Sequence, residues 1–142
     1  MIDIDKKTGI LRVHQSFVKK IEPATELEEL KRVFPIWEQT VWDDERSSLK
    51  LELQNRQRDE IVHLRLYFVK SKLSSIEIFI TGASFGDRWS RWSKAKEIRR
   101  KKYHESLFSS VLGKHRWGSV KSVLDKKAGY SCVRLEYADL ST

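Results

Sequence analysis

The stretch that decides the fold is residues 49–80, which read LKLELQNRQRDEIVHLRLYFVKSKLSSIEIFI. Apolar residues alternate with polar ones in three runs, at 49–53, 61–68 and 75–80. Alternation of this kind is typical of a strand that buries one face and exposes the other. Because only short polar turns separate the runs, the stretch predicts three antiparallel strands joined as a meander.

Further strands are expected at both ends of the chain. Ile2–Ile4 and Ile10–Val13 alternate around a turn in which Gly9 can adopt positive φ, so they predict an opening hairpin. Apolar residues also alternate over 120–124 and 133–137, on either side of a polar turn. These two runs predict a closing pair of strands.

Two helices are expected between the strands. Thr25 and Glu28 have the spacing of a capping box, which predicts a short helix over about 25–34. Ser90 or Ser93 can cap a longer helix that runs to about residue 112. The second half of this helix is expected to pack on the sheet, and its basic first half to project past the sheet edge.

The predicted order of elements is ββαβββαββ, with hairpin connections and no parallel crossover units. This order indicates an α+β fold with a mostly antiparallel sheet of about six to seven strands, one short helix and one long helix, the helices lying on one face. The length of 142 residues suits one core, so we expect a single domain over 1–142.

Composition excludes several classes of protein. No apolar run approaches the roughly 18 residues of a membrane helix, so no membrane partner is expected. The first residues lack the basic flank and apolar stretch of a signal peptide, so the expected compartment is the cytoplasm. Cys132 is the single cysteine, which excludes an internal disulfide and a paired-cysteine zinc or redox site.

The net charge of +8 is concentrated rather than spread. Arg88–Lys102 holds eight basic residues and one acid, a net charge of +7, and the rest of the chain is close to neutral. Glu22–Glu45 carries eight acids and two basic residues, a net charge of −6. The sequence therefore predicts two surface patches of opposite sign, unless they lie close together and neutralise each other across the fold.

No assembled catalytic set is visible in the sequence. The four histidines, His14, His63, His104 and His115, have no nucleophile or carboxylate at catalytic spacing. The consecutive acids Asp43, Asp44 and Glu45 would point in different directions, so they are interpreted as a solvated charge run and not as a metal site. We therefore expect no enzyme activity, no cofactor and no metal.

The basic segment with its tryptophans supports two hypotheses. Trp89 and Trp92 are three residues apart, so both could anchor the helix while the basic side chains form a protein interface. Alternatively, the basic residues could bind nucleic-acid phosphates while the tryptophans stack on bases. The protein interface is favoured because no recognised nucleic-acid-binding motif surrounds the segment. Both hypotheses use the same basic residues, Arg88, Arg91, Lys94, Arg99, Arg100, Lys101 and Lys102.

Several motifs together resemble a family of small bacterial proteins. They are the opening Ile-Asp and Thr-Gly-Ile-Leu, the segment 85–93 with its Trp-Ser-Arg-Trp-Ser, and the segment from Trp117-Gly-Ser-Val to Ser131. The resemblance spans nearly the whole chain. It departs at residues 126–129, Lys-Lys-Ala-Gly, where relatives tend to have Pro-Lys-Gly-Gly, and this puts only the turn geometry in question.

Single-domain cytoplasmic proteins of this kind look like immunity partners of polymorphic toxins delivered by contact-dependent or type VI systems. The resemblance implies a non-enzymatic protein that neutralises a cognate toxin domain by stoichiometric binding. The α+β domain itself is expected to be monomeric or dimeric. If the toxin is acidic, the basic helix is the expected contact. If the toxin is basic, the expected contact is the acidic set, Glu28, Glu29, Asp43, Asp44 and Glu45.

Overall fold

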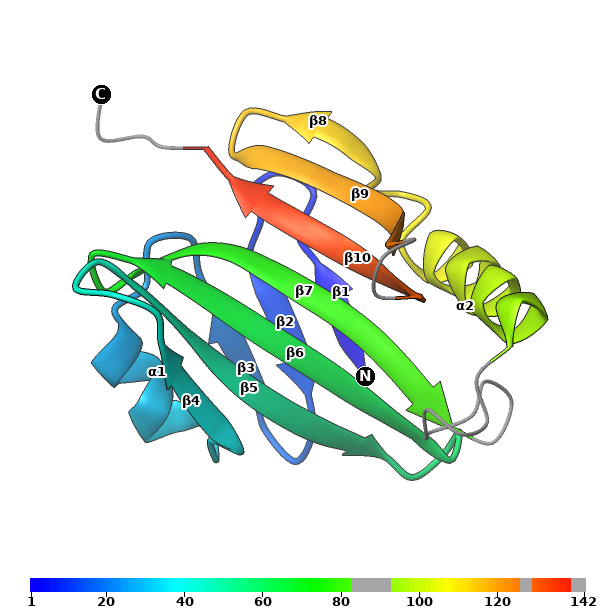
Figure 1. Ribbon diagram of the computed structural model, residues 1–142, viewed down its shortest axis with the longest axis horizontal. Coiled ribbons are helices and arrows are strands. Elements are labelled where there is room, and N and C mark those ends of the chain that lie inside the picture. The colour runs from blue at the N-terminus through cyan, green and yellow to red at the C-terminus, as the bar shows by residue number, and fades with distance from the viewer. Residues whose placement is uncertain (83–92, 126–128, 139–142) are drawn as a thin grey trace.

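The chain forms two antiparallel sheets and two helices in the computed structural model, which describes residues 1–82, 93–125 and 129–138 (Figure 1). The smaller sheet has the strand order β1-β2-β3, with β1 at Ile2–Ile4, β2 at Leu11–His14 and β3 at Val18–Ile21. The first two strands are the predicted opening hairpin, and Gly9 has the expected positive φ of 76°. The third strand extends this hairpin.

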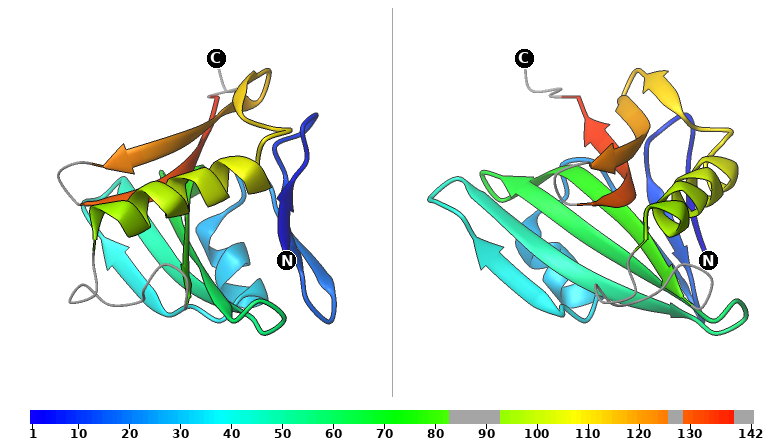
Figure 2. Two further views of the ribbon diagram at one scale, coloured as in Figure 1. Left: turned by 90° about the vertical axis from the view of Figure 1, so that its right-hand side faces the viewer. Right: turned by 45° about the vertical axis from the view of Figure 1, so that its right-hand side comes forward.

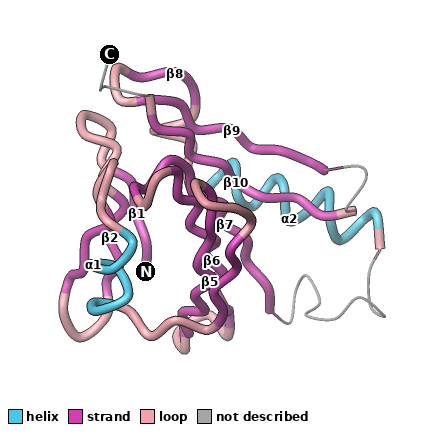
Figure 3. Tube along the Cα trace, turned by 60° about the vertical axis from the view of Figure 1, so that its left-hand side comes forward, coloured by secondary structure: helices cyan, strands magenta, loops and turns pink. Residues whose placement is uncertain are grey.

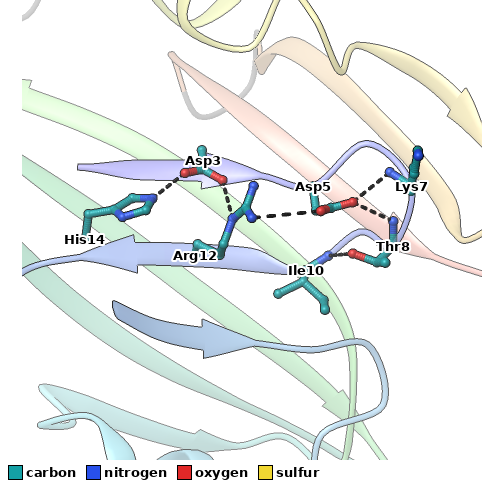
Figure 4. Close-up of polar contacts among 7 residues, drawn as sticks. All are labelled: Asp3, Asp5, Lys7, Thr8, Ile10, Arg12 and His14. Carbon is teal, nitrogen blue, oxygen red and sulfur yellow. Dashed lines mark hydrogen bonds and ion pairs between the residues drawn. The ribbon is translucent and has the colours of Figure 1, made fainter. Parts of the chain in front are cut away.

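A polar network lines the exposed side of the opening hairpin (Figure 4). Asp3 accepts hydrogen bonds from Arg12 Nε at 2.7 Å and from the His14 ring. Asp5 Oδ1 accepts the backbone amides of Lys7 and Thr8, at 2.8 and 3.0 Å. The bond from the Lys7 amide is the main cause of the lowered pKa of Asp5. This network fixes the hairpin turn with local contacts.

The short helix α1 occupies Leu27–Val33, close to its predicted bounds. The predicted capping box is wrong, because the N-cap residue is Glu26 and no side chain caps the helix. Thr25 Oγ1 instead donates to the carbonyl of Glu22 at 2.7 Å. Leu27 and Leu30 are buried, so packing of one apolar face, and not capping, holds this helix.

The larger sheet has the order β4-β5-β6-β7-β10-β9-β8, and every neighbouring pair is antiparallel. The predicted meander forms its centre. The strands are β4 at Glu38–Val41, β5 at Arg46–Asn55, β6 at Glu60–Val69, β7 at Lys72–Gly82, β8 at Gly113–His115, β9 at Gly118–Asp125 and β10 at Tyr130–Tyr137.

The predicted α+β class and mostly antiparallel sheet are confirmed, with ten strands in the described part of the chain. The strands missing from the predicted order are β3, β4 and β8, each three or four residues long. A segment this short has too few residues to show alternation, and its pairing partner decides whether it becomes a strand.

The core lies between the larger sheet on one side and the smaller sheet with α1 on the other (Figures 2 and 3). From the larger sheet, alternate residues such as Leu64 and Ile78 point inward and are fully buried. From the smaller sheet, Leu11 and Val13 are likewise fully buried. Burial of these side chains is the main favourable contribution to folding.

Two aromatic residues, Trp117 just before β9 and Tyr137 at the end of β10, hold the opening hairpin. Trp117 Nε1 donates to the carbonyl of Lys6 at 2.9 Å, and Tyr137 Oη donates to the carbonyl of Gly9 at 2.8 Å. The Trp117 ring lies so close to Gly9 that a Cβ there would approach it to 2.5 Å. Gly9 is therefore required both by its positive φ and by this contact.

Helix α2, Lys94–Leu107, lies where two neighbouring strands of the larger sheet separate (Figure 1). The ladder between β7 and β10 pairs Val133–Glu136 with Ile78–Ser75. Toward the N-terminal end of β10 and the C-terminal end of β7 this pairing stops and the two strands diverge. The helix crosses this opening instead of lying flat on one face, as Figure 2 shows. The expectation that both helices cover one face is therefore wrong for α2.

Candidate protein-binding surfaces

The N-terminus of α2 is fixed by the predicted serine cap. Ser93 is the N-cap residue, and its hydroxyl oxygen accepts the backbone amide of Lys96 at 3.1 Å. After the fourteen helical residues, Phe108 is the C-cap residue, so the helix ends about a turn earlier than expected. The cap and this end set which side chains face the sheet and which face solvent.

Side chains of α2 accept hydrogen bonds from backbone amides of β7 and β10. These amides lie where the two strands have diverged and no longer pair with each other. Glu97 Oε2 accepts the backbone amide of Ser131 at 3.1 Å, and His104 Nε2 accepts that of Ile80 at 3.3 Å. Both side chains are buried, with exposed fractions of 3% and 0%. The helix thus replaces part of a missing ladder, and its first half is attached to the sheet instead of projecting past it.

Arg100 completes this buried polar cluster. Its guanidinium pairs with Glu97 and lies 4.4 Å from the centroid of the Phe79 ring. Burial lowers the pKa of Arg100 to about 10, so the side chain remains charged at neutral pH and Glu97 compensates that charge. Burial, together with the Arg100 charge, lowers the pKa of His104 to about 4, so the imidazole is neutral there.

The basic residues singled out from the sequence divide into three groups. Lys94, Arg99 and Lys102 are exposed along the outer side of α2. Lys101 is half-buried and pairs with Glu105, while Arg100 is buried in the cluster described above. Arg100 is therefore not accessible to a partner, contrary to expectation. Arg88 and Arg91 lie outside the described residues.

The acidic residues singled out from the sequence lie at two places. Glu28 and Glu29 are on α1, and the other three acids form the turn between β4 and β5. Asp43 Oδ2 lies 2.6 Å from a terminal guanidinium nitrogen of Arg46, and the hydrogen bond from Arg46 is the main cause of the lowered pKa of Asp43. Asp44 and Glu45 form no ion pair within the part of the chain that the structure describes.

Three exposed apolar side chains beside the acidic turn were not identified from the sequence as functional. Trp37, Val41 and Trp42 have exposed fractions of 60%, 68% and 58%. They lie on or beside β4, which is one of the two edge strands of the larger sheet. The sequence signal for this surface is the pair of tryptophans at the two ends of a short segment. The sequence alone does not show that their side chains are exposed, because exposure depends on the tertiary packing around β4.

Side chains suited to catalysis or metal binding are not assembled in the ranges described. No group of three or more His, Cys, Asp or Glu side chains there could hold a metal ion. His63 Nε2 lies 2.8 Å from Thr81 Oγ1, and burial lowers the pKa of His63. Cys132 is buried, as expected, and burial raises the pKa of its thiol to about 11, unlike that of a nucleophilic cysteine.

Neither described helix is long and apolar enough to cross a membrane.

Comparisons with known proteins identify a fold and no family. No protein-family model matches the chain, and no curated protein matches its sequence. Among solved structures, the fold is similar to that of one chain of Rhs1-CT in complex with its cognate immunity protein RhsI1. This likeness has a TM-score of 0.60 at 15% identity, and it covers 96% of this chain and 87% of that chain.

Proposed function

We propose that this protein is an immunity protein, which binds a cognate toxin domain stoichiometrically and neutralises it in the cytoplasm. The observation that carries the proposal is the fold likeness, over 96% of the chain, to a chain of a complex containing a cognate immunity protein. Such an inhibitor needs no reacting groups. It needs a rigid surface with a few large anchors and complementary charge.

Two charged surfaces are candidates for the contact with the toxin. The basic surface consists of Lys94, Arg99 and Lys102 on the outer side of α2, and it would suit an acidic partner. The acidic surface consists of Glu29 on α1 with Asp44 and Glu45 in the β4–β5 turn, and it would suit a basic partner. α2 is attached to the sheet through Glu97 and His104, and α1 packs on the core through Leu27 and Leu30, so both helices present their charges rigidly.

The test uses the toxin domain encoded beside this protein. We expect the purified domain to bind the wild-type chain with one-to-one stoichiometry in titration calorimetry and to lose its toxicity when the two are co-expressed. Absence of such a domain from the neighbouring reading frames, or absence of binding, would contradict the proposal.

Two charge-reversal variants identify the surface that contributes. One carries Lys94→Glu, Arg99→Glu and Lys102→Glu, and the other carries Glu29→Lys, Asp44→Lys and Glu45→Lys. Arg100 and Asp43 are left unchanged, because each makes an internal ion pair whose loss would affect folding. A rim charge mainly changes the association rate. Reversing the charges of the contributing surface should therefore slow association with the toxin domain, and the difference from the wild-type chain should shrink as salt increases.

Nucleic-acid binding by α2 is tested with labelled RNA and DNA and the same basic-surface variant. A phosphate-binding surface loses affinity steeply as salt increases. Binding of labelled RNA or DNA at low salt, abolished by Lys94→Glu, Arg99→Glu and Lys102→Glu, would favour the nucleic-acid hypothesis over the toxin partner.

A further inference from the structure

The β4 edge of the larger sheet is open in the part of the chain that the structure describes. β4 pairs with β5 on one side, and no described strand pairs with its other side. Proteins usually protect such an edge with lysine, proline, a covering element or inward-pointing charge, because its free backbone groups attract other strands. The edge here reads Trp-Glu-Gln-Thr-Val-Trp from Trp37 to Trp42, with neither lysine nor proline.

The backbone register shows which groups of β4 are free to pair. Trp42 donates its amide to the carbonyl of Arg46 at 2.9 Å, so residues 38, 40 and 42 bond to β5. Gln39 and Val41 occupy the alternate positions, where the amide and carbonyl point away from β5. These two residues therefore present the donors and acceptors that an added strand would use.

Large side chains lie on both sides of the free backbone groups of Gln39 and Val41. Trp37 lies before the strand and Trp42 after it, and Val41 is exposed between them. Trp42 also lines a pocket of about 390 Å³ with Arg46, Tyr67 and Val69. Tryptophans that a partner buries are among the side chains that most often dominate the binding energy of an interface.

The charges along this edge favour a basic occupant. Glu38, Asp44 and Glu45 are exposed there and form no ion pair within the described ranges. Arg46 is compensated by Asp43, and the Lys50 ammonium lies 4.9 Å from the centroid of the Trp37 ring. Lys70 is a further exposed cation beside the acidic turn, where its amide donates to the Glu45 carbonyl at 2.6 Å, so the three acids outnumber it. Flanking acids at an open edge attract a strand that carries lysine or arginine beside its apolar residues.

We propose that the toxin domain adds a basic strand to the β4 edge, where Trp37 and Trp42 anchor it and Gln39 and Val41 pair with its backbone. This rests on the proposed function, because the occupant is the neutralised toxin. It assigns the contact to the β4 edge, defined as Trp37–Trp42 with the acidic turn after it, and not to the basic surface of α2.

Side-chain anchoring is tested by titrating the toxin domain encoded beside this protein against three variants. Trp37→Ala with Trp42→Ala should weaken binding at least about 30-fold, since two hot-spot anchors are removed. Phe17→Ala is the control, because Phe17 is an aromatic residue that is even more exposed, at 77%, and lies in the turn between β2 and β3 instead of on the β4 edge. It should change the affinity less than about twofold. Lys94→Glu with Arg99→Glu and Lys102→Glu should likewise leave binding within about threefold.

Backbone pairing is tested separately by hydrogen exchange. In the complex of wild-type chain and toxin domain, the amides of Gln39 and Val41 should exchange at least about tenfold more slowly than in the free protein. Val41→Pro removes one outward amide without removing a ladder bond to β5, so it should weaken binding and leave the fold intact. The exchange measurement on the wild-type chain does not depend on how well this variant folds.

The possible outcomes separate this inference from the proposed function. If the wild-type chain binds the toxin domain but the tryptophan variant binds equally well, the β4 edge is not the contact and the inference fails alone. Two copies of the chain pairing through β4, seen as a dimer by sedimentation that Val41→Pro dissociates, would also overturn it. If the wild-type chain does not bind the toxin domain, both the proposed function and the inference fail.

Discussion

The imidazole of His104 occupies the place of a neighbouring strand for Ile80. Its Nε2 accepts the Ile80 backbone amide at 3.3 Å, at a point where β7 and β10 have diverged. A strand amide buried beside a sheet opening would otherwise lack a hydrogen-bond partner, which is costly. The long helix is therefore part of the sheet's hydrogen bonding as well as part of the packing.

Because His104 is buried in its neutral form, we expect the free energy of unfolding to depend on pH in the acid range. The pKa of His104 is about 4 in the folded chain and near 6.5 when unfolded, so the unfolded state binds the extra proton between these values. Stability should therefore fall as pH decreases from about 6.5 to about 4, by up to about 3 kcal/mol from this group. Urea denaturation at several pH values measures the slope.

His104→Gln is the control for the pH effect. Its amide oxygen can accept the Ile80 amide, but the side chain does not titrate. The variant should lose most of the slope, and the smaller remainder should include His63, whose pKa burial also lowers. An unchanged slope in His104→Gln would contradict the assignment of the pH effect to this imidazole.

The buried pair of Glu97 and Arg100 predicts strong coupling. Glu97→Gln leaves the Arg100 charge without its carboxylate and should destabilise the fold by about 3 kcal/mol or more. Arg100→Leu combined with Glu97→Gln should be less destabilised than the sum of the two single variants, because no uncompensated charge remains. Chemical denaturation of all four members of the cycle gives the coupling, and simple additivity would rule the pair out as a structural unit.

Gly9 predicts a steric conflict with Trp117. Gly9→Ala should destabilise the fold by about 1–3 kcal/mol, because the new methyl group meets the ring and positive φ disfavours alanine. In a Trp117→Leu background the penalty for Gly9→Ala should shrink toward that of the backbone strain alone. Thermal unfolding of the four proteins measures this difference, and an equal penalty in both backgrounds would show that the ring does not restrict Gly9.

The thiol of Cys132 should be unreactive while the chain is folded. Burial raises its pKa to about 11, so the thiolate fraction is small at pH 8, and the side chain is 1% exposed. We expect reaction with a thiol reagent only at the rate of unfolding, with rapid reaction in denaturant. Fast labelling under native conditions would show that β10 opens locally.

The sequence by itself determined the opening hairpin, the central meander and the two helices, because each follows from local periodicity and turn residues. It also located the two segments of opposite charge. Of the candidate basic residues, it identified Lys94, Arg99 and Lys102 at exposed positions, but it did not show that Arg100 is buried. Helical spacing gives the relative orientation of side chains and does not say which of them meet another element.

Only the tertiary structure decided where the sheet ends and where it opens. β4 is a strand because β5 pairs with it, and its outer side is an edge because no described strand pairs there. Because β7 and β10 diverge, the amides of Ile80 and Ser131 have no partner between these two strands, and His104 and Glu97 accept them instead. These features depend on contacts between residues distant in the chain, and local sequence patterns do not encode such contacts.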